Sequence, residues 1–220
     1  MKKIISWVAA LSLGACTPAV ADPHIPKWNT YNSMGCMMLR ECKEGTEPIL
    51  SWADLGKQFK PWGDELGRIF SAMNQAGIDV YIAHEKYFVD KTRGLYNVKG
   101  NNLFINEKYL DDPQQLVSVI RHEGWHAAQD CMAGSLNNTF TAIVWPDNKV
   151  PAWVNRGAEL TYEMSPKAIP YEAEAMYAAM SNSETADALE VCANPLVNMW
   201  DKYPPTPFTK KWLIEKGHIR

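Results

Sequence analysis

Three residues in the middle of the chain have the types and the spacing to bind a metal ion. They are His122, Glu123 and His126, which form the pattern H-E-x-x-H between Arg121 and Asp130. On a helix, residues four apart lie on one face, so both imidazoles can reach a single ion. Glu123 lies one step round the helix and can hydrogen-bond a water molecule beside that ion. The pattern predicts zinc-dependent hydrolysis with Glu123 as the general base.

A hydrolytic zinc site needs three protein ligands and one open position, so a third ligand must come from another segment. The sequence offers Glu172 and Glu174, both in a helix expected over residues 170–180. Because the two glutamates are two residues apart, they point about 200° away from each other around the helix. Only one of them can therefore face the metal, and the spacing alone does not decide which.

H-E-x-x-H followed by a helix that carries E-x-E-A resembles the gluzincin class of zinc metallopeptidases, particularly its minimal-domain members. The resemblance covers residues 78–180. In several such families the ligand glutamate is followed three residues later by alanine. Glu172 and Ala175 match this pattern, so the resemblance favours Glu172 over Glu174 as the third ligand.

The sequence departs from this family pattern at Met176, where an aspartate or asparagine would orient a ligand histidine. Asp130, one turn beyond His126, is a candidate substitute. The glycine and third histidine that mark metzincins do not follow His126 at the required spacing. Trp125 is most simply a packing residue.

The resemblance implies a zincin-like fold, a bound Zn²⁺ ion and a peptide or protein substrate. It also implies that the metal activates a water molecule and that Glu123 passes the proton to the leaving amine. An edge strand of a hairpin expected over residues 94–106 offers a place for an extended peptide. Four residues are candidates for stabilising the oxyanion: His84, Arg156, Tyr162 and Tyr171.

Other interpretations of the same residues remain open. A zincin-like envelope protein could bind or scaffold a partner without catalysis if the cleft were closed. A zinc enzyme could also cleave another bond, such as an amide in cell-wall peptide. The two histidines could instead be core residues of an amphipathic helix, although their spacing around Glu123 argues against this.

The N-terminus has the pattern of an export signal. Within residues 1–21, Lys2 and Lys3 precede an apolar run, and Ala19-Val20-Ala21 forms a small-x-small cleavage site. The sequence Leu13-Gly14-Ala15-Cys16 also resembles a lipobox, in which the cysteine is acylated. Both patterns predict export to the periplasm or the exterior, and only the second anchors the protein to a membrane through Cys16.

Cysteine usage agrees with export. Besides Cys16, the chain has Cys36, Cys42, Cys131 and Cys192, and four thiols in an oxidising compartment suggest two disulfides. The short spacing favours Cys36–Cys42 as a local loop and leaves Cys131–Cys192 by elimination. The alternative is that some of these thiols remain free and buried.

The net charge of the chain limits the kinds of partner that it can bind. The chain has 22 basic and 25 acidic residues, for a net charge of −3. Removal of an N-terminal signal with two lysines makes the balance more acidic. An acidic protein lacks the basic patch that nucleic acid or an anionic membrane surface requires, which argues against both as the main partner.

The flanking elements that must position the metal-binding pattern can also be predicted. Residues 22–62, rich in Trp, Pro and Gly, predict an irregular extension before a domain over residues 63–193. In that domain we expect a helix beginning at Asp64, a half-buried strand over residues 78–83, and a hairpin pairing residues 95–98 with 103–105.

The central helix is expected to begin with Asp112 as its N-cap and Pro113 at its first position, and to end before Gly134. Further helices are expected over residues 158–164, 170–180 and 184–192, followed by a tail over residues 194–220. Together these elements predict an α+β fold with a small, mostly antiparallel sheet.

Overall fold

The computed structural model describes residues 30–220 with the exception of residue 90. The predicted export signal over residues 1–21, including Cys16, lies outside the described residues. Within the described part, no helix has the length and apolarity needed to cross a membrane.

Four strands form one mixed sheet in the order β1-β2-β4-β3. β1 (Thr46–Ile49) runs antiparallel to β2 (Asp79–Ala83), and β2 runs parallel to β4 (Asn102–Asn106). β3 (Gly94–Asn97) pairs antiparallel with β4 as the predicted hairpin. The α+β class is therefore confirmed, with a sheet that is mixed because of the β2–β4 pairing, and β3 lies at one edge.

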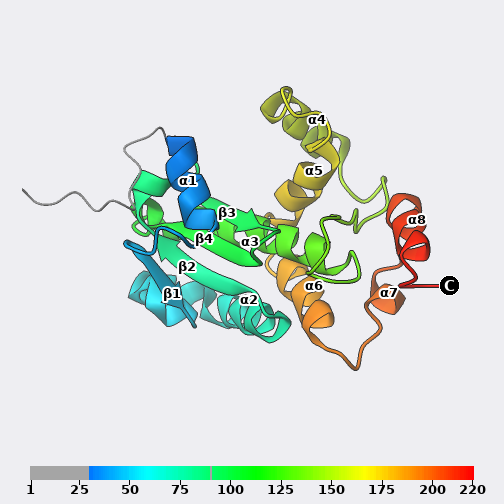
Figure 1. Cartoon of the computed structure of the whole chain (residues 1–220), viewed down its shortest axis with the longest axis horizontal. Helices are drawn as coiled ribbons and strands as arrows, with labels where there is room; N and C mark the ends of the chain where they lie inside the picture. Colours follow the sequence, from blue (N-terminus) through cyan, green and yellow to red (C-terminus); the bar gives the residue numbers. More distant parts are fainter. Residues whose placement is uncertain (1–29, 90) are drawn as a thin grey trace, which may run out of the picture.

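Both faces of this sheet are covered (Figure 1). Alternation along the strands sends Val80, Leu103 and Ile105 into the main core, which includes side chains of α2 (Gly63–Ala76) and α3 (Pro113–Cys131). The opposite face is covered by a second cluster, whose members include Met37, Tyr81, Tyr87 and Phe104. β2 is consequently more buried than the half-buried strand expected from its alternation.

The N-terminal segment supplies this second layer. The expectation that residues 22–62 are irregular is wrong for their described part, which contains α1 (Thr30–Met38), strand β1 and two short 3₁₀ helices. The Cys36–Cys42 disulfide closes the loop that follows α1. The sequence pattern did not indicate strand β1, because the strand is only four residues long and contains Pro48. Proline is uncommon in strands but is tolerated at the edge of a sheet.

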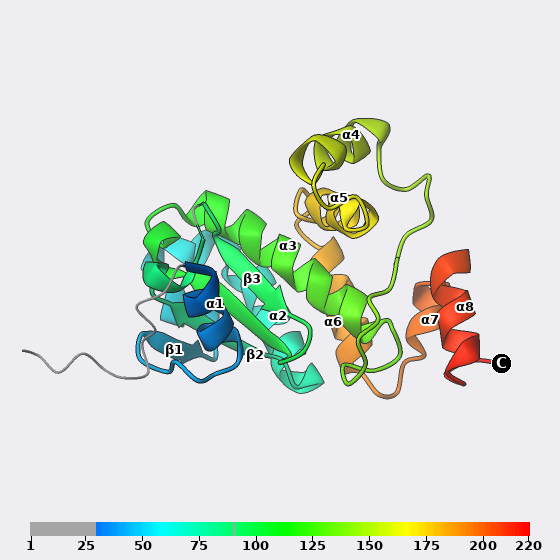
Figure 2. The same cartoon turned by 45° about the horizontal axis from the view of Figure 1, so that its top comes forward.

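A second, helical half contains α4 (Ala152–Thr161), α5 (Ile169–Ala178) and α6 (Glu184–Ala193). The C-terminal segment adds α7 (Met199–Lys202) and α8 (Pro207–Glu215), so it is more regular than the predicted tail. α4 begins six residues earlier than expected, directly after Pro151, which occupies the N-cap. Figure 2 shows α3 running from the sheet into this helical half.

α3 is held firmly at both ends and in its middle. Asp112 Oδ1 accepts a hydrogen bond from the Gln115 amide, which confirms the predicted N-cap. In the middle, the buried Arg121 guanidinium binds both carboxylate oxygens of Glu65 in α2 at 2.7 Å. The Cys131–Cys192 disulfide joins the end of α3 to α6. Both predicted disulfides are thus confirmed, and such bridges are typical of an oxidising, extracellular environment.

The two disulfides should differ in their contribution to stability. Cys131 and Cys192 are 61 residues apart and Cys36 and Cys42 only 6, so the first removes more conformational entropy from the unfolded chain. We expect the double variant Cys131→Ser/Cys192→Ser to lose about 4 kcal/mol of unfolding free energy, and Cys36→Ser/Cys42→Ser about 2 kcal/mol. Urea unfolding of the two variants checks this, and a larger loss for the 36–42 pair would contradict it.

Candidate metal centre

α3 presents His122, Glu123 and His126 on the side that faces away from the main core. The opposite side is anchored by buried Val117 and Ala128. The two histidine side chains keep 20% and 17% of their surface exposed, and their rings meet edge to face with centroids 4.8 Å apart. The helical spacing read from the sequence therefore places both imidazoles on one side of the helix.

α5 brings Glu172 to these histidines. Its Oε2 atom lies 3.2 Å from His122 Nε2 and 3.5 Å from His126 Nε2, and the two Nε2 atoms are 3.2 Å apart. Together His122, His126 and Glu172 form a group that could hold a metal ion. Glu174, the alternative third ligand, points elsewhere.

The size of this triangle fits a metal ion. Ligand atoms about 2.0 Å from a tetrahedral ion are separated from each other by about 3.3 Å, which matches the spacing of the three donor atoms. The donor set of two imidazoles and one carboxylate leaves one tetrahedral position free.

Electrostatics at this group also favour a cation. Burial alone would raise the pKa of Glu172, but hydrogen bonds with His122 and His126 and their charges hold it well below its usual value. Burial alone would lower the pKa of His126, but the hydrogen bond with Glu172 and the charge of Glu123 raise it to about 9. Two carboxylates thus stabilise positive charge between the histidines.

Glu174 stabilises the packing of α5 on α3 instead of facing the metal group. It is buried between these two helices, with 2% of its surface exposed. Its carboxylate accepts hydrogen bonds from Gln129 Nε2, Trp125 Nε1 and the backbone amides of Val144 and Trp145. Burial raises the pKa of Glu174, and these donors oppose the rise. All four partners are N–H donors, which suit an ionised carboxylate.

Gln129 connects Glu174 to the metal group. Its Oε1 atom lies 2.8 Å from His126 Nδ1, while its Nε2 donates to Glu174 and to the Tyr171 carbonyl. This contact fixes the His126 ring so that Nε2 faces the other donors. Gln129 is not among the site residues predicted from the sequence, although its position three residues after His126 on one helix face could have suggested it.

Asp130 does not orient a ligand histidine, so that expectation is wrong. Position 130 is turned toward the sheet, where Asp130 Oδ2 accepts a 2.7 Å hydrogen bond from the Tyr96 hydroxyl. Met176, where the family pattern has a polar residue, lines a cavity beside His122. In this protein the residue that orients a candidate ligand histidine is Gln129 on α3, which contacts His126.

Strand β3 holds Glu123 from the other side. The Tyr96 amide donates to Glu123 Oε2 at 2.8 Å, and none of the described residues hydrogen-bonds Oε1. The approach is close, because a Cβ at Gly94 would lie 2.6 Å from Val119 Cγ1 and 3.1 Å from Glu123 Cγ. Glycine is therefore required at position 94, a constraint that only the packing of β3 on α3 reveals.

Two cavities flank the metal group, and His122, Glu123 and Tyr162 line both of them. One has a volume of about 680 Å³ and extends along α4 and the end of α5. The other, of about 620 Å³, extends along β3 toward Tyr171 and Phe208. The donor atoms therefore lie in the middle of a cleft.

Tyr162 is the best placed of the four oxyanion candidates. Burial raises its pKa, and the charge of Glu172 raises it further, so its hydroxyl keeps its proton. Tyr171 lines only the second cavity. His84 and Arg156 are not among the described residues that line either cavity: His84 binds the Lys86 amide at the end of β2, and Arg156 pairs with Glu159 on exposed α4. Trp125 is fully buried against Trp145, as expected for a packing residue.

Comparison of the chain with protein-family models, curated proteins and solved structures finds no match. The geometry of the site is therefore the basis for the function proposed below.

Replacing the two glutamates separately should distinguish the ligand from its support. With Zn²⁺ as the probe ion, Glu172→Gln should lower metal affinity by more than about 100-fold, because it removes one of the three donors. Glu174→Gln should lower affinity by about 10- to 100-fold and also cost about 2 kcal/mol or more of unfolding free energy, because it places an amide among N–H donors. Calorimetric titration and urea unfolding measure both effects. Greater loss of affinity in Glu174→Gln would overturn the assignment.

Asp130 should make stability depend on pH. It is fully buried, and its Oδ1 atom has no hydrogen-bond partner among the described residues. Burial raises the pKa of Asp130 to about 7, and the Tyr96 hydrogen bond offsets this only in part. Between about pH 4 and pH 7 the folded protein keeps a proton that the unfolded chain releases, so stability falls as pH rises, by at most about 4 kcal/mol.

Urea unfolding from pH 4 to pH 8 tests this dependence. Asp130→Asn should flatten the decline, because the amide does not titrate. The matched change Asp111→Asn, at an exposed aspartate, should leave the decline in place. An identical pH profile in Asp130→Asn and the wild type would contradict the prediction.

Proposed function

We propose that the protein is an exported, zinc-dependent hydrolase that cleaves peptide bonds. The observation that carries the proposal is the triangle of donor atoms from His122, His126 and Glu172, with edges of 3.2 to 3.5 Å. Glu123 lies beside this triangle in an open cleft. Two imidazoles, one carboxylate and an adjacent glutamate are the residue types that hydrolytic zinc sites use.

Zinc, when bound, supplies Lewis-acid chemistry that acidifies a water molecule and polarises a carbonyl. The protein supplies the proton transfers. Glu123, held at Oε2 by the Tyr96 amide, is placed to take a proton from the attacking water through Oε1 and to deliver it to the leaving nitrogen. Tyr162, whose hydroxyl keeps its proton and hydrogen-bonds Glu172, would turn that hydrogen bond to the developing oxyanion.

The shape of the cleft supports an extended peptide as the substrate. One cavity is lined by Ser118 and Val119 and the other by His126 and Tyr171, and Glu123 lines both, so a chain bound at Glu123 could continue into each of them. The edge strand β3 lines the cleft with Gly94 and Tyr96. Among the described strands β3 pairs only with β4. On its other side the Tyr96 amide already binds Glu123, so the Gly94 backbone is the part of this edge that would receive an extended chain.

The resemblance to gluzincins and the two disulfides support the same proposal. An H-E-x-x-H helix followed by a glutamate-bearing helix is the arrangement that the resemblance implies, and disulfides suit an exported protein. The export signal predicted from the sequence of residues 1–21 supports a periplasmic or secreted location, with a lipid anchor if Cys16 is acylated.

Substitution of Glu123 tests the proposed chemistry. Glu123→Gln removes the proton acceptor but none of the three metal donors, so the variant should retain one zinc ion per chain and lose peptide-cleaving activity by about 100-fold or more. Metal analysis by mass spectrometry and cleavage of an internally quenched peptide library measure the two quantities.

The matched change Glu215→Gln, at an exposed position on α8, should leave both quantities at their wild-type values. Full activity in Glu123→Gln, or absence of stoichiometric metal in the wild type, would refute the proposal. A wild type that binds zinc but cleaves no peptide would favour a non-catalytic binding protein.

A further inference from the structure

Gly157 lies in the interior of α4, where glycine is a poor choice. It forms helices less readily than alanine, because it has more backbone freedom to lose. Close packing excludes a side chain from some helical glycines of this protein: a Cβ at Gly124 would lie 2.8 Å from Thr185 Cγ2. At Gly157 a Cβ would meet no atom of the described residues within 4 Å. Neither packing nor backbone conformation accounts for this glycine.

Gly157 faces the cavity of about 680 Å³ that begins at His122 and Glu123. A side chain at position 157 would project into this space from the wall that α4 forms. The absence of a side chain at Gly157 therefore leaves space in the cavity that a ligand bound in the cleft could occupy.

The helical side of this cavity is apolar. α4 contributes Trp153, which is 64% exposed, and the end of α5 contributes Met180, which is 55% exposed. Val154 and Met176 line the space between them. Large apolar side chains left exposed around a cavity indicate a surface that an apolar group covers.

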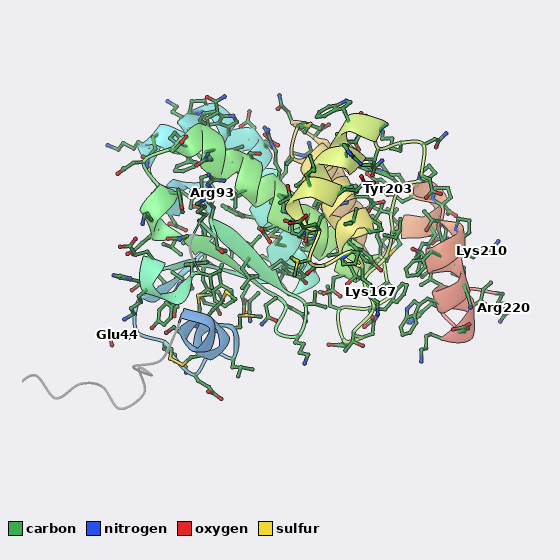
Figure 3. All side chains as sticks on the ribbon, turned by 90° about the horizontal axis from the view of Figure 1, so that it is seen from above. Glu44, Arg93, Lys167, Tyr203, Lys210 and Arg220 are labelled. Atoms are coloured by element: carbon green, nitrogen blue, oxygen red, sulfur yellow. A yellow bond between two sulfur atoms is a disulfide. The ribbon has the colours of Figure 1, made fainter. Side chains whose placement is uncertain are left out.

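The charges around the cavity exclude a cationic ligand group. Its opposite side comes from the start of β3 and the preceding segment, with Arg93 and Lys91. Arg93 lies beside α3 on the sheet side of the molecule (Figure 3). Among the described residues that line the cavity, Glu123 is the only acidic one, and it lies at the metal group. A lysine or arginine side chain would meet the like charges of Lys91 and Arg93 here, with no described carboxylate beside it other than Glu123.

We propose that this cavity is the specificity pocket of the enzyme and receives a large apolar side chain, aromatic or long aliphatic, next to the cleaved bond. Gly157 is the specificity-determining residue, because its missing side chain leaves room for that group against Trp153 and Met180. The inference rests on the proposed function, since it names the class of peptide that the site selects.

Cleavage selectivity is the first test. Internally quenched peptides that differ only in Phe, Leu, Ala or Lys beside the cleaved bond are compared by kcat/KM on the zinc-loaded protein. The wild type should prefer Phe or Leu over Ala and Lys by about tenfold or more. Gly157→Leu should fill the pocket and lower the Phe-to-Ala ratio by about tenfold, and Gly157→Ala should have an intermediate effect.

Gly67→Ala is the matched control, because Gly67 is also an interior helical glycine, and its Cβ would lie at an ordinary 3.8 Å from Trp52 Cδ1. Both Gly157→Ala and Gly67→Ala should raise the melting temperature, because alanine is the better helix former. Only the change at 157 should alter selectivity. An unchanged Phe-to-Ala ratio in a folded, active Gly157→Leu protein would overturn the inference and leave the proposed function standing.

A binding measurement on the metal-free protein separates the two proposals. N-acetyl-L-phenylalaninamide should shift the indole N–H NMR signal of Trp153, assigned with Trp153→Phe, whereas N-acetylglycinamide should not. The shift should disappear in Gly157→Leu and persist in Gly67→Ala. If the phenylalanine probe shifts the Trp153 signal as described but the zinc-loaded protein cleaves no peptide, the apolar pocket is supported and the proposed peptidase function is refuted. The absence of any Trp153 shift with the phenylalanine probe would refute the pocket.

Discussion

The carboxylate of Glu174, buried between α3 and α5, is the interaction on which the metal group depends. Its four N–H partners come from α3 and from the segment that contains Val144 and Trp145. A buried carboxylate without these partners would be strongly destabilising, so α5 can dock on α3 in only one rotation. That rotation turns Glu172, two residues earlier, toward His122 and His126. One buried charge thus fixes a ligand helix and, through Gln129, a ligand histidine.

α3 is the element shared by the two halves of the molecule. Its Arg121 joins Glu65 of α2 and also binds Asn182 Oδ1 after α5, so the residue before His122 connects the sheet side to the helical side. The cleft forms where β3 approaches α3 on one side and α4 and α5 approach it on the other. Rigid support on both sides suits a site whose donor atoms must stay within a few tenths of an ångström of each other.

The sequence was most informative where local chemistry decides structure. The N-cap Asp112, the first-turn Pro113 and the spacing of His122 and His126 depend only on helix geometry, and the structure agrees. The sequence was least informative where distant segments meet. β1 is four residues long and contains Pro48, so it has no clear strand pattern, and its order comes from pairing with β2. The contact of Gln129 with His126 is local, but the orientation of the Gln129 amide depends on its hydrogen bond to Glu174, which is 45 residues away in the sequence.

The sequence by itself determined which residue types could bind a metal, that two histidines share a helix face, and that only one of two glutamates could join them. These conclusions follow from the fixed geometry of one helix. The tertiary structure alone decided that Glu172 is the one that joins, that Tyr162 rather than His84 or Arg156 lies beside it, and that Gly157 opens a cavity there. The rotation of one helix relative to another is set by burial and by hydrogen bonds between side chains that are distant in the sequence. The spacing of residues within one helix does not determine that rotation.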